Sequence, residues 1–107
     1  MAKYLWIATY NPQGVKGLLH AGGTRRKKAV EAALRTVGGK MEAYYYALGA
    51  VDCYIIADVP DNVSIAALSL VINAAGAVSV HTTALLTVEE MDLAVKQYKH
   101  LKYQPPK

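Results

Sequence analysis

The chain of 107 residues contains no phenylalanine, a single cysteine and only 8 acidic residues. The single cysteine, Cys53, excludes an intrachain disulfide and a zinc site built from cysteines. Charged residues make up 19% of the chain, below the roughly 25% of an average soluble domain. The apolar runs end within about 14 residues, too short to cross a bilayer as a helix. We therefore expect no membrane span, no signal peptide and a reduced, cytoplasmic setting.

All aromatic rings in the chain belong to eight tyrosines and one tryptophan. Each large ring therefore has a polar tip, which needs a hydrogen-bond partner when the ring is buried. Apolar residues make up 53% of the chain, a high share for a small soluble domain. We expect one domain over residues 1–107, which association with further copies would stabilise because so short a chain buries a modest core.

Hydrophobic periodicity and turn residues divide the chain into alternating strands and helices. The expected elements are a strand over 3–10, a short helical stretch ending at Gly22 and Gly23, a helix over 25–37 with Thr24 as its N-cap, strands over 40–48 and 53–59, a helix from Asp61 or Asn62 to Gly76, a strand over 77–87 and a helix over 88–102. Thr87 and Glu90 form a predicted capping box at the start of the last helix. Residues 103–107 are expected to fray.

This order, β-α-β-β-α-β with a terminal helix, is the split βαβ pattern of the α+β ferredoxin-like fold. It predicts a core over about residues 3–87, with a four-stranded antiparallel sheet. Right-handed crossovers place both helices on one face of the sheet. The other face, called the open face below, is expected to meet either water or another copy of the chain.

Strand alternation predicts which side chains lie on the open face. In this interpretation Leu5, Ile7, Cys53, Ile55 and Ala57 point toward the helices, together with Tyr45 of the stretch EAYYYALG. The open face is then aromatic, and its predicted residues are Tyr4, Trp6, Tyr10, Tyr44, Tyr46 and Tyr54. Of these, Tyr4, Trp6, Tyr44, Tyr46 and Tyr54 are the expected interface between copies. A ligand cavity on that face is the alternative.

Two further surfaces stand out in the sequence. The helix over 61–75 is apolar almost all round, which predicts burial on more than one side and a second contact between copies. The stretch GGTRRKK, residues 22–28, places four cations at a helix start next to two glycines. Such a corner favours an anionic ligand, and its predicted binding residues are Gly22, Gly23, Thr24, Arg25 and Arg26. A solvated basic surface is the alternative interpretation.

Nucleic acid is a weaker candidate partner for this basic stretch. Ferredoxin-like domains that bind RNA stack bases on aromatic residues of the sheet. The basic-aromatic string typical of them is missing from the strand CYIIADV, residues 53–59. The basic residues also belong to a helix, away from the open face.

Sequence spacing supports no metal or cofactor site. The three histidines, His20, His81 and His100, form no metal-binding pair, and no phosphate loop or dinucleotide fingerprint is present. His81 is the histidine expected to line an interior. A catalytic interpretation combines it with Tyr46 or Tyr10 as a proton-transfer pair, whereas a hydrogen-bonded structural role is the alternative. Asp52 is expected to bond to backbone in its turn, and Cys53 to be an inert buried thiol.

The chain as a whole resembles the GYD domain family, which is grouped with the dimeric α+β barrel proteins. The resemblance extends over about residues 3–92, through KYLWIATYNPQGVKGLL, GGTRRKKAVEAALRTVGGKMEAYYYALG and VDCYIIADVPDNVSIAALSLVINAAGAVSVHTTALLTVEEMD. The family name refers to Gly-Tyr-Asp near a turn, and here Gly49 and Asp52 are kept while Val51 takes the tyrosine position. The resemblance implies a ferredoxin-like fold and assembly through the sheet, without implying a reaction.

The sequence thus favours a homo-oligomeric domain that binds a small ligand, an anionic one among the candidates, or serves as an accessory or regulatory subunit. A cofactor-independent enzyme of the barrel type, using His81 and a tyrosine, is the second hypothesis. A purely structural interaction module is the third.

Overall fold

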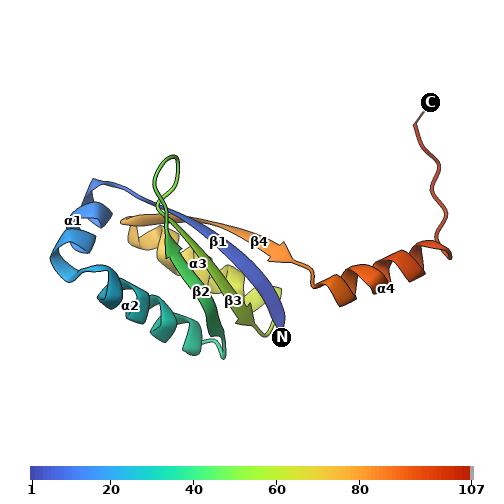
Figure 1. The fold of residues 1–107 in the computed structure, drawn as a ribbon, viewed down its shortest axis with the longest axis horizontal. Helices are drawn as coiled ribbons and strands as arrows, with labels where there is room; N and C mark the ends of the chain where they lie inside the picture. The colour runs from blue at the N-terminus through green and yellow to red at the C-terminus, as the bar shows by residue number, and fades with distance from the viewer. Residues whose placement is uncertain (107) are drawn as a thin grey trace.

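The structure is a computed structural model that describes residues 1–106 (Figure 1). Its elements, in chain order, are β1 (Ala2–Tyr10), α1 (Pro12–Ala21), α2 (Gly23–Arg35), β2 (Lys40–Tyr46), β3 (Cys53–Val59), α3 (Asn62–Ala75), β4 (Val78–Leu85) and α4 (Val88–Tyr98).

One antiparallel sheet with the strand order β2-β3-β1-β4 forms the centre of the molecule. Figure 1 shows α1, α2 and α3 on one side of this sheet and no helix covering the other side. Both crossovers, through α1 and α2 and through α3, therefore lie on the same face, as right-handed connections require. The α+β ferredoxin-like fold with a C-terminal helix is confirmed.

The register of β1 corrects the predicted faces of the sheet. In the antiparallel pairing, Tyr4 lies opposite Ala57 and Trp6 opposite Ile55. Directly paired residues share a face, so Tyr4 and Trp6 point toward the helices with the β3 core residues. The prediction that they lie on the open face is wrong. Both alternating sets of β1 are apolar, and hydrophobicity alone does not distinguish them.

The predicted assignment of the β2 side chains to the two faces of the sheet is also the reverse of the observed one. Tyr44 pairs with Ile55 and Tyr46 with Cys53, both on the helix-covered face. Tyr45 pairs with Tyr54 and lies on the open face, where it is 70% exposed. Of the predicted interface residues, Tyr54 alone keeps its place on the open face.

The core accommodates large rings because their polar tips find partners. Trp6 is 2% exposed, and its indole N–H donates to Ser69 Oγ at 3.1 Å and to Thr82 Oγ1 at 2.9 Å. The Tyr4 hydroxyl donates to the side-chain oxygen of Asn62. A fully buried large side chain stabilises the fold by about 1.5–3 kcal/mol, and these bonds remove the penalty for burying a donor.

The capping residues determine where the helices begin and end. The predicted N-cap Thr24 is wrong, because α2 begins at Gly23 after Gly22, whose φ of 85° suits glycine. Asp61 caps α3 by accepting from the Ser64 N–H at 2.9 Å, and Gly76 ends α3 in the left-handed conformation. The capping box of Thr87 and Glu90 is confirmed.

Several predicted ends extend too far. The helix over 25–37 is Gly23–Arg35, the strands over 40–48 and 77–87 are Lys40–Tyr46 and Val78–Leu85, and the helix over 88–102 is Val88–Tyr98. Residues 101–106 form neither helix nor strand, and Lys107 lies outside the described residues.

The last helix, α4, extends away from the body (Figure 1). Each of its residues is exposed. The radius of gyration is 17.0 Å, larger than the roughly 13 Å expected for a compact chain of this length. Within residues 1–106, no helix combines the length and apolar character needed to cross a membrane.

The first helix, α1, docks through a glycine. Asn11 caps α1 by accepting from the Gly14 N–H at 2.9 Å, and its own N–H donates to the Ala77 carbonyl at 3.1 Å. Gly14 is buried against this same carbonyl, which a β-carbon at this position would overlap. Gly17, one turn further along α1, faces open space.

These two glycines give a matched test of the docking. We expect Gly14→Ala to lower the free energy of unfolding by about 1–3 kcal/mol, because the backbone of Ala77 must shift. Gly17→Ala should leave it unchanged or raise it by up to about 1 kcal/mol through helix propensity. Urea denaturation measures both values, and equal stability of the two variants would contradict the close approach.

Candidate ligand-binding site

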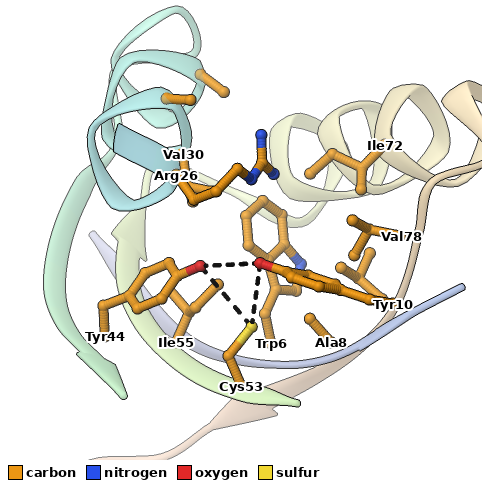
Figure 2. A pocket seen from close by; sticks show the side chains of 13 residues that line it. Trp6, Ala8, Tyr10, Arg26, Val30, Tyr44, Cys53, Ile55, Ile72 and Val78 are labelled. Carbon is orange, nitrogen blue, oxygen red and sulfur yellow. Dashed lines mark hydrogen bonds between the residues drawn. The ribbon is translucent and has the colours of Figure 1, made fainter. Parts of the chain in front are cut away.

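A pocket of about 190 Å³ lies between the sheet and the helices α2 and α3 (Figure 2). It forms at the end of the sheet where β1 stops and β3 and β4 start. Its walls are mostly apolar, with Ala8 at the base, Val30 on α2, Ile72 on α3 and Val78 on β4. Because β1 pairs with β3 and β4, these residues meet on one face.

Two tyrosines and the cysteine converge inside this space, which we call the tyrosine pocket. The Tyr10 and Tyr44 hydroxyl oxygens are 3.5 Å apart. Cys53 Sγ lies 3.8 Å from the Tyr44 oxygen and 4.0 Å from the Tyr10 oxygen. Figure 2 shows the three groups pointing toward one another. These are long, weak contacts, so the hydroxyls keep bonding capacity for a ligand.

Arg26 adds a positive charge to the rim of the tyrosine pocket. It belongs to the early part of α2, and its side chain extends over the Tyr10 hydroxyl (Figure 2). Within residues 1–106 its guanidinium has no carboxylate partner, because both ion pairs there are formed by Lys3. Arg26 thus lies beside the pocket with donors available.

Burial keeps the polar groups of the pocket protonated. It raises the pKa of Tyr44 far above its ordinary value, and the hydrogen bonds with Tyr10 and Tyr46 act in the same direction. Burial also raises the pKa of Tyr10, against the opposite influence of Tyr44 and Arg26. It raises the pKa of Cys53, against the hydrogen bond with Tyr44. At neutral pH the site therefore presents two phenols and a thiol, all neutral.

Asp52 holds the turn after β2 against the end of β1. Its carboxylate accepts from the Tyr10 N–H at 2.7 Å, and its own N–H donates to the Ala8 carbonyl at 2.9 Å. The Ala47 N–H donates to the Asp52 carbonyl at 2.8 Å. The carboxylate thus bonds to backbone, but on β1 and not within its own turn as predicted. This bond fixes the backbone from which Tyr10 enters the pocket.

The predicted anion corner is only partly directed at the pocket. Gly22 and Gly23 separate α1 from α2, and the Tyr46 hydroxyl donates to the Gly23 carbonyl at 2.9 Å. Thr24 and Arg25 are exposed, whereas Arg26 is partly buried and lines the pocket. Of the five residues, Gly22, Thr24 and Arg25 are exposed, Gly23 is partly buried against Tyr46, and only Arg26 lines the pocket.

His81 does not meet the tyrosines with which it was predicted to act. It lies opposite Ile7 on the open face, whereas Tyr10 and Tyr46 are on the helix-covered face. The sheet therefore separates His81 from both hydroxyls within one chain. Among residues 1–106, no three histidine, cysteine, aspartate or glutamate side chains come close enough together to hold a metal ion.

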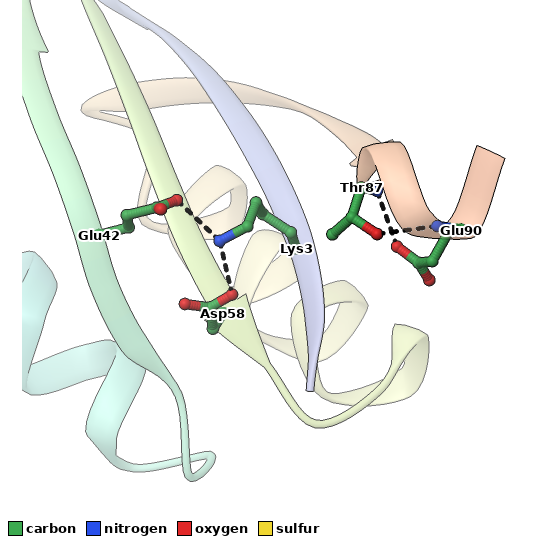
Figure 3. Close-up of polar contacts among 5 residues, drawn as sticks. All are labelled: Lys3, Glu42, Asp58, Thr87 and Glu90. Atoms are coloured by element: carbon green, nitrogen blue, oxygen red, sulfur yellow. Dashed lines mark hydrogen bonds and ion pairs between the residues drawn. The ribbon is translucent and has the colours of Figure 1, made fainter. Parts of the chain in front are cut away.

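The open face has one charged end and an otherwise uncharged surface. Lys3 Nζ donates to Glu42 at 2.8 Å and to Asp58 at 2.9 Å (Figure 3). These bonds, that with Glu42 foremost, raise the pKa of Lys3. A bulge at Met41–Ala43 accompanies this arrangement. The apolar side chains of the face include Leu5, Ile7, Tyr45, Tyr54 and Ile56.

Sequence reasoning identified three members of the tyrosine pocket without bringing them together. Tyr10 was a catalytic candidate, Arg26 an anion-binding candidate and Tyr44 an interface candidate. The signal that could have joined them is position: Tyr10 ends one strand, Tyr44 is near the end of another, and Cys53 begins a third. Using that signal requires the register of the strands, which the sequence leaves open.

The α+β sheet with its helix-side pocket defines the class of protein as a ferredoxin-like domain with a small, partly open pocket between sheet and helices. The sequence model of the GYD domain matches residues 4–95, and the chain belongs to the GYD domain family. Neither a curated protein nor a solved structure matches it. Its turn contains Gly49 and Asp52 with Val51 between them, so no tyrosine hydroxyl is available at Val51.

The raised pKa values make stability sensitive to alkaline pH. In the unfolded chain, cysteine and tyrosine lose protons near their ordinary values of 9.0 and 10.0. The folded pocket retains these protons, so the unfolded state binds fewer of them and the free energy of unfolding falls as the pH rises from about 9 upward. We expect Tyr44→Phe to make this fall shallower, as measured by urea denaturation at a series of pH values.

The exposed Tyr45 provides the matched control on the same strand. Tyr45→Phe should retain the pH dependence of the unmodified protein. A Tyr44→Phe variant whose stability falls as steeply as that of Tyr45→Phe would contradict burial of the Tyr44 hydroxyl in the pocket.

Proposed function

We propose that the protein is a homo-oligomeric domain that binds a small ligand in the tyrosine pocket. The supporting observation is a mostly apolar cavity into which a few polar groups converge, the arrangement typical of ligand sites. Tyr10, Tyr44 and Arg26 supply those polar groups from three different elements. The contact between the Tyr10 and Tyr44 hydroxyls, at 3.5 Å, is too long to use their full bonding capacity.

The size of the pocket limits the ligand. A volume of about 190 Å³ corresponds to roughly six water molecules, and it is below the roughly 300–1,000 Å³ of sites for drug-sized molecules. A nucleotide or a flavin is therefore too large to be contained in this pocket. A ligand with a single ring or a short chain fits this space.

The polar groups favour binding over acid–base catalysis. The residues that line the pocket include no carboxylate and no histidine, and its thiol and phenols hold their protons at neutral pH. A general base needs a group that accepts a proton near the working pH. A ligand-binding or regulatory role therefore fits this site better than the His–Tyr enzyme.

Assembly through the open face completes the proposal. Tyr45 and Tyr54 are 70% and 41% exposed, next to an uncharged set of aliphatic side chains. Interface cores are depleted in charge and enriched in tyrosine, and packing two such faces together would remove them from water. At the rim, Lys3 forms ion pairs with both Glu42 and Asp58, which leaves these three residues with a net charge of −1.

The helix α3 offers a second surface for association. It has no charged residue over Asn62–Ala75, and its outer side exposes Val63, Leu70 and Val71. Its buried residues, on the inner side, are Ile65 and Leu68. An apolar helix with one side exposed suits a contact between copies in an assembly larger than a dimer.

The ligand-binding proposal is tested by filling the cavity. We expect ligand-observed NMR to detect binding among small one-ring fragments such as indole, benzamide and benzoate. Ala8→Leu inserts a larger side chain at the base of the pocket and should abolish this binding. Thermal denaturation checks that the variant folds, and unchanged binding to a folded Ala8→Leu variant would contradict the proposal.

The assembly proposal is tested by a charge on the open face. We expect the unmodified chain to be oligomeric by size-exclusion chromatography with light scattering, and Tyr45→Lys to shift it toward the monomer. Leu19, 81% exposed on α1, provides a control, and Leu19→Lys should leave the oligomer intact. A monomeric unmodified chain, or an equal effect of both variants, would contradict assembly through this face.

A further inference from the structure

The polar lining of the tyrosine pocket carries information about the chemistry of its occupant. Arg26 is the one charged side chain that lines the pocket, and its guanidinium has no carboxylate partner among residues 1–106. A charge in partly apolar surroundings is costly without a counterion or hydrogen bonds. An occupant with a negative group would remove this cost.

The pocket also has more donors than acceptors. Tyr10, Tyr44, Cys53 and Arg26 each bring at least one hydrogen to donate, whereas the lining contains no carboxylate, amide or imidazole side chain to accept. The phenol oxygens are its principal side-chain acceptors, and they already face each other. A ligand therefore gains most by presenting acceptor atoms to this end of the pocket.

The number of charges distinguishes between anions. One guanidinium neutralises one negative charge, so a dianion such as phosphate would keep an uncompensated charge against apolar walls. A carboxylate matches the guanidinium with two parallel hydrogen bonds. The opposite side of the cavity, with Ala8, Ile72 and Val78, is apolar, so these side chains offer a small hydrated ion no hydrogen-bond partner.

We infer that the ligand is a small monocarboxylic acid, with its carboxylate bound by Arg26 and the Tyr10 and Tyr44 hydroxyls and its apolar body against Ala8, Ile72 and Val78. This inference rests on the proposed ligand-binding function of the same pocket. It moves the predicted anion site from the glycine corner at Gly22–Gly23 into the cavity.

The probes for the test are benzoate, its neutral analogue benzamide, and inorganic phosphate, titrated calorimetrically into the full chain at neutral pH. Benzoate should bind at least about tenfold more tightly than benzamide, the difference expected for a charge-assisted hydrogen bond. Hexanoate should also bind, because the site recognises the acid group on an apolar body. Phosphate should neither bind nor compete.

Adjacent arginines supply the matched variants. Arg26→Met should reduce benzoate affinity to that of benzamide, and Tyr44→Phe should weaken it by a smaller factor. Arg25→Met removes an equal charge from the exposed side of α2 and should leave benzoate binding unchanged. Thermal denaturation verifies that each variant folds.

The outcomes separate this inference from the function on which it rests. If benzamide binds as tightly as benzoate and Arg26→Met changes neither, the pocket binds ligands but the acid assignment is overturned. If phosphate binds in competition with benzoate, or Arg25→Met weakens binding as much as Arg26→Met, general attraction to the basic helix replaces the pocket. If neither acid nor benzamide binds, both the inference and the proposed ligand-binding function are overturned.

Discussion

The antiparallel register of β1 against β3 is the constraint on which the rest of the structure depends. It places Ala8 opposite Cys53 and Trp6 opposite Ile55, and so determines which large rings the helices cover. A shift by one residue would exchange the two faces of β1. Tyr10 would then leave the pocket, and Leu5 and Ile7 would replace Tyr4 and Trp6 beneath the helices. The pocket and the open face are thus two consequences of one pairing.

Hydrogen bonds to the hydroxyl and indole N–H groups explain how tyrosine and tryptophan can form a core that contains no phenylalanine. Trp6 and Tyr4 satisfy their donors with Ser69, Thr82 and Asn62, so the polar atoms of these buried rings have hydrogen-bond partners. At the end of the sheet the same chemistry is less complete, because Tyr10 and Tyr44 have mainly each other and the weakly bonding thiol of Cys53. This contrast within one face separates the structural rings from the candidate ligand-binding rings.

The order of strands and helices was predictable from the sequence because it depends on local signals. Gly76, Asp61 and the pair Thr87 and Glu90 mark helix ends through bonds within a few residues of one another, and the structure contains these caps. Thr24 misled the prediction because Gly22 reaches a backbone conformation that starts α2 two residues earlier than predicted. Family resemblance and the strand–helix order gave the same fold.

The candidate site was less predictable because it depends on contacts distant in sequence. Tyr10 meets Tyr44 across 34 residues, and both alternating sets of β1 are apolar enough to form a core. Periodicity therefore predicted the strand but not which of its two sides is buried. For the same reason His81 was predicted to act with tyrosines that in fact lie on the other face of the sheet. Only the register decides that Arg26, Tyr10 and Tyr44 meet while His81 faces away.

The most direct test of this account is the set of nuclear Overhauser contacts around Cys53. With selectively labelled tyrosines, the account predicts contacts from the Cys53 methylene protons to the rings of Tyr10 and Tyr44. It predicts none from the ring of Tyr10 to that of Tyr54 within one chain, because Tyr54 lies on the open face. Contacts between Tyr10 and Tyr54, with none to Cys53, would show the opposite register and contradict both the pocket and the assignment of the open face.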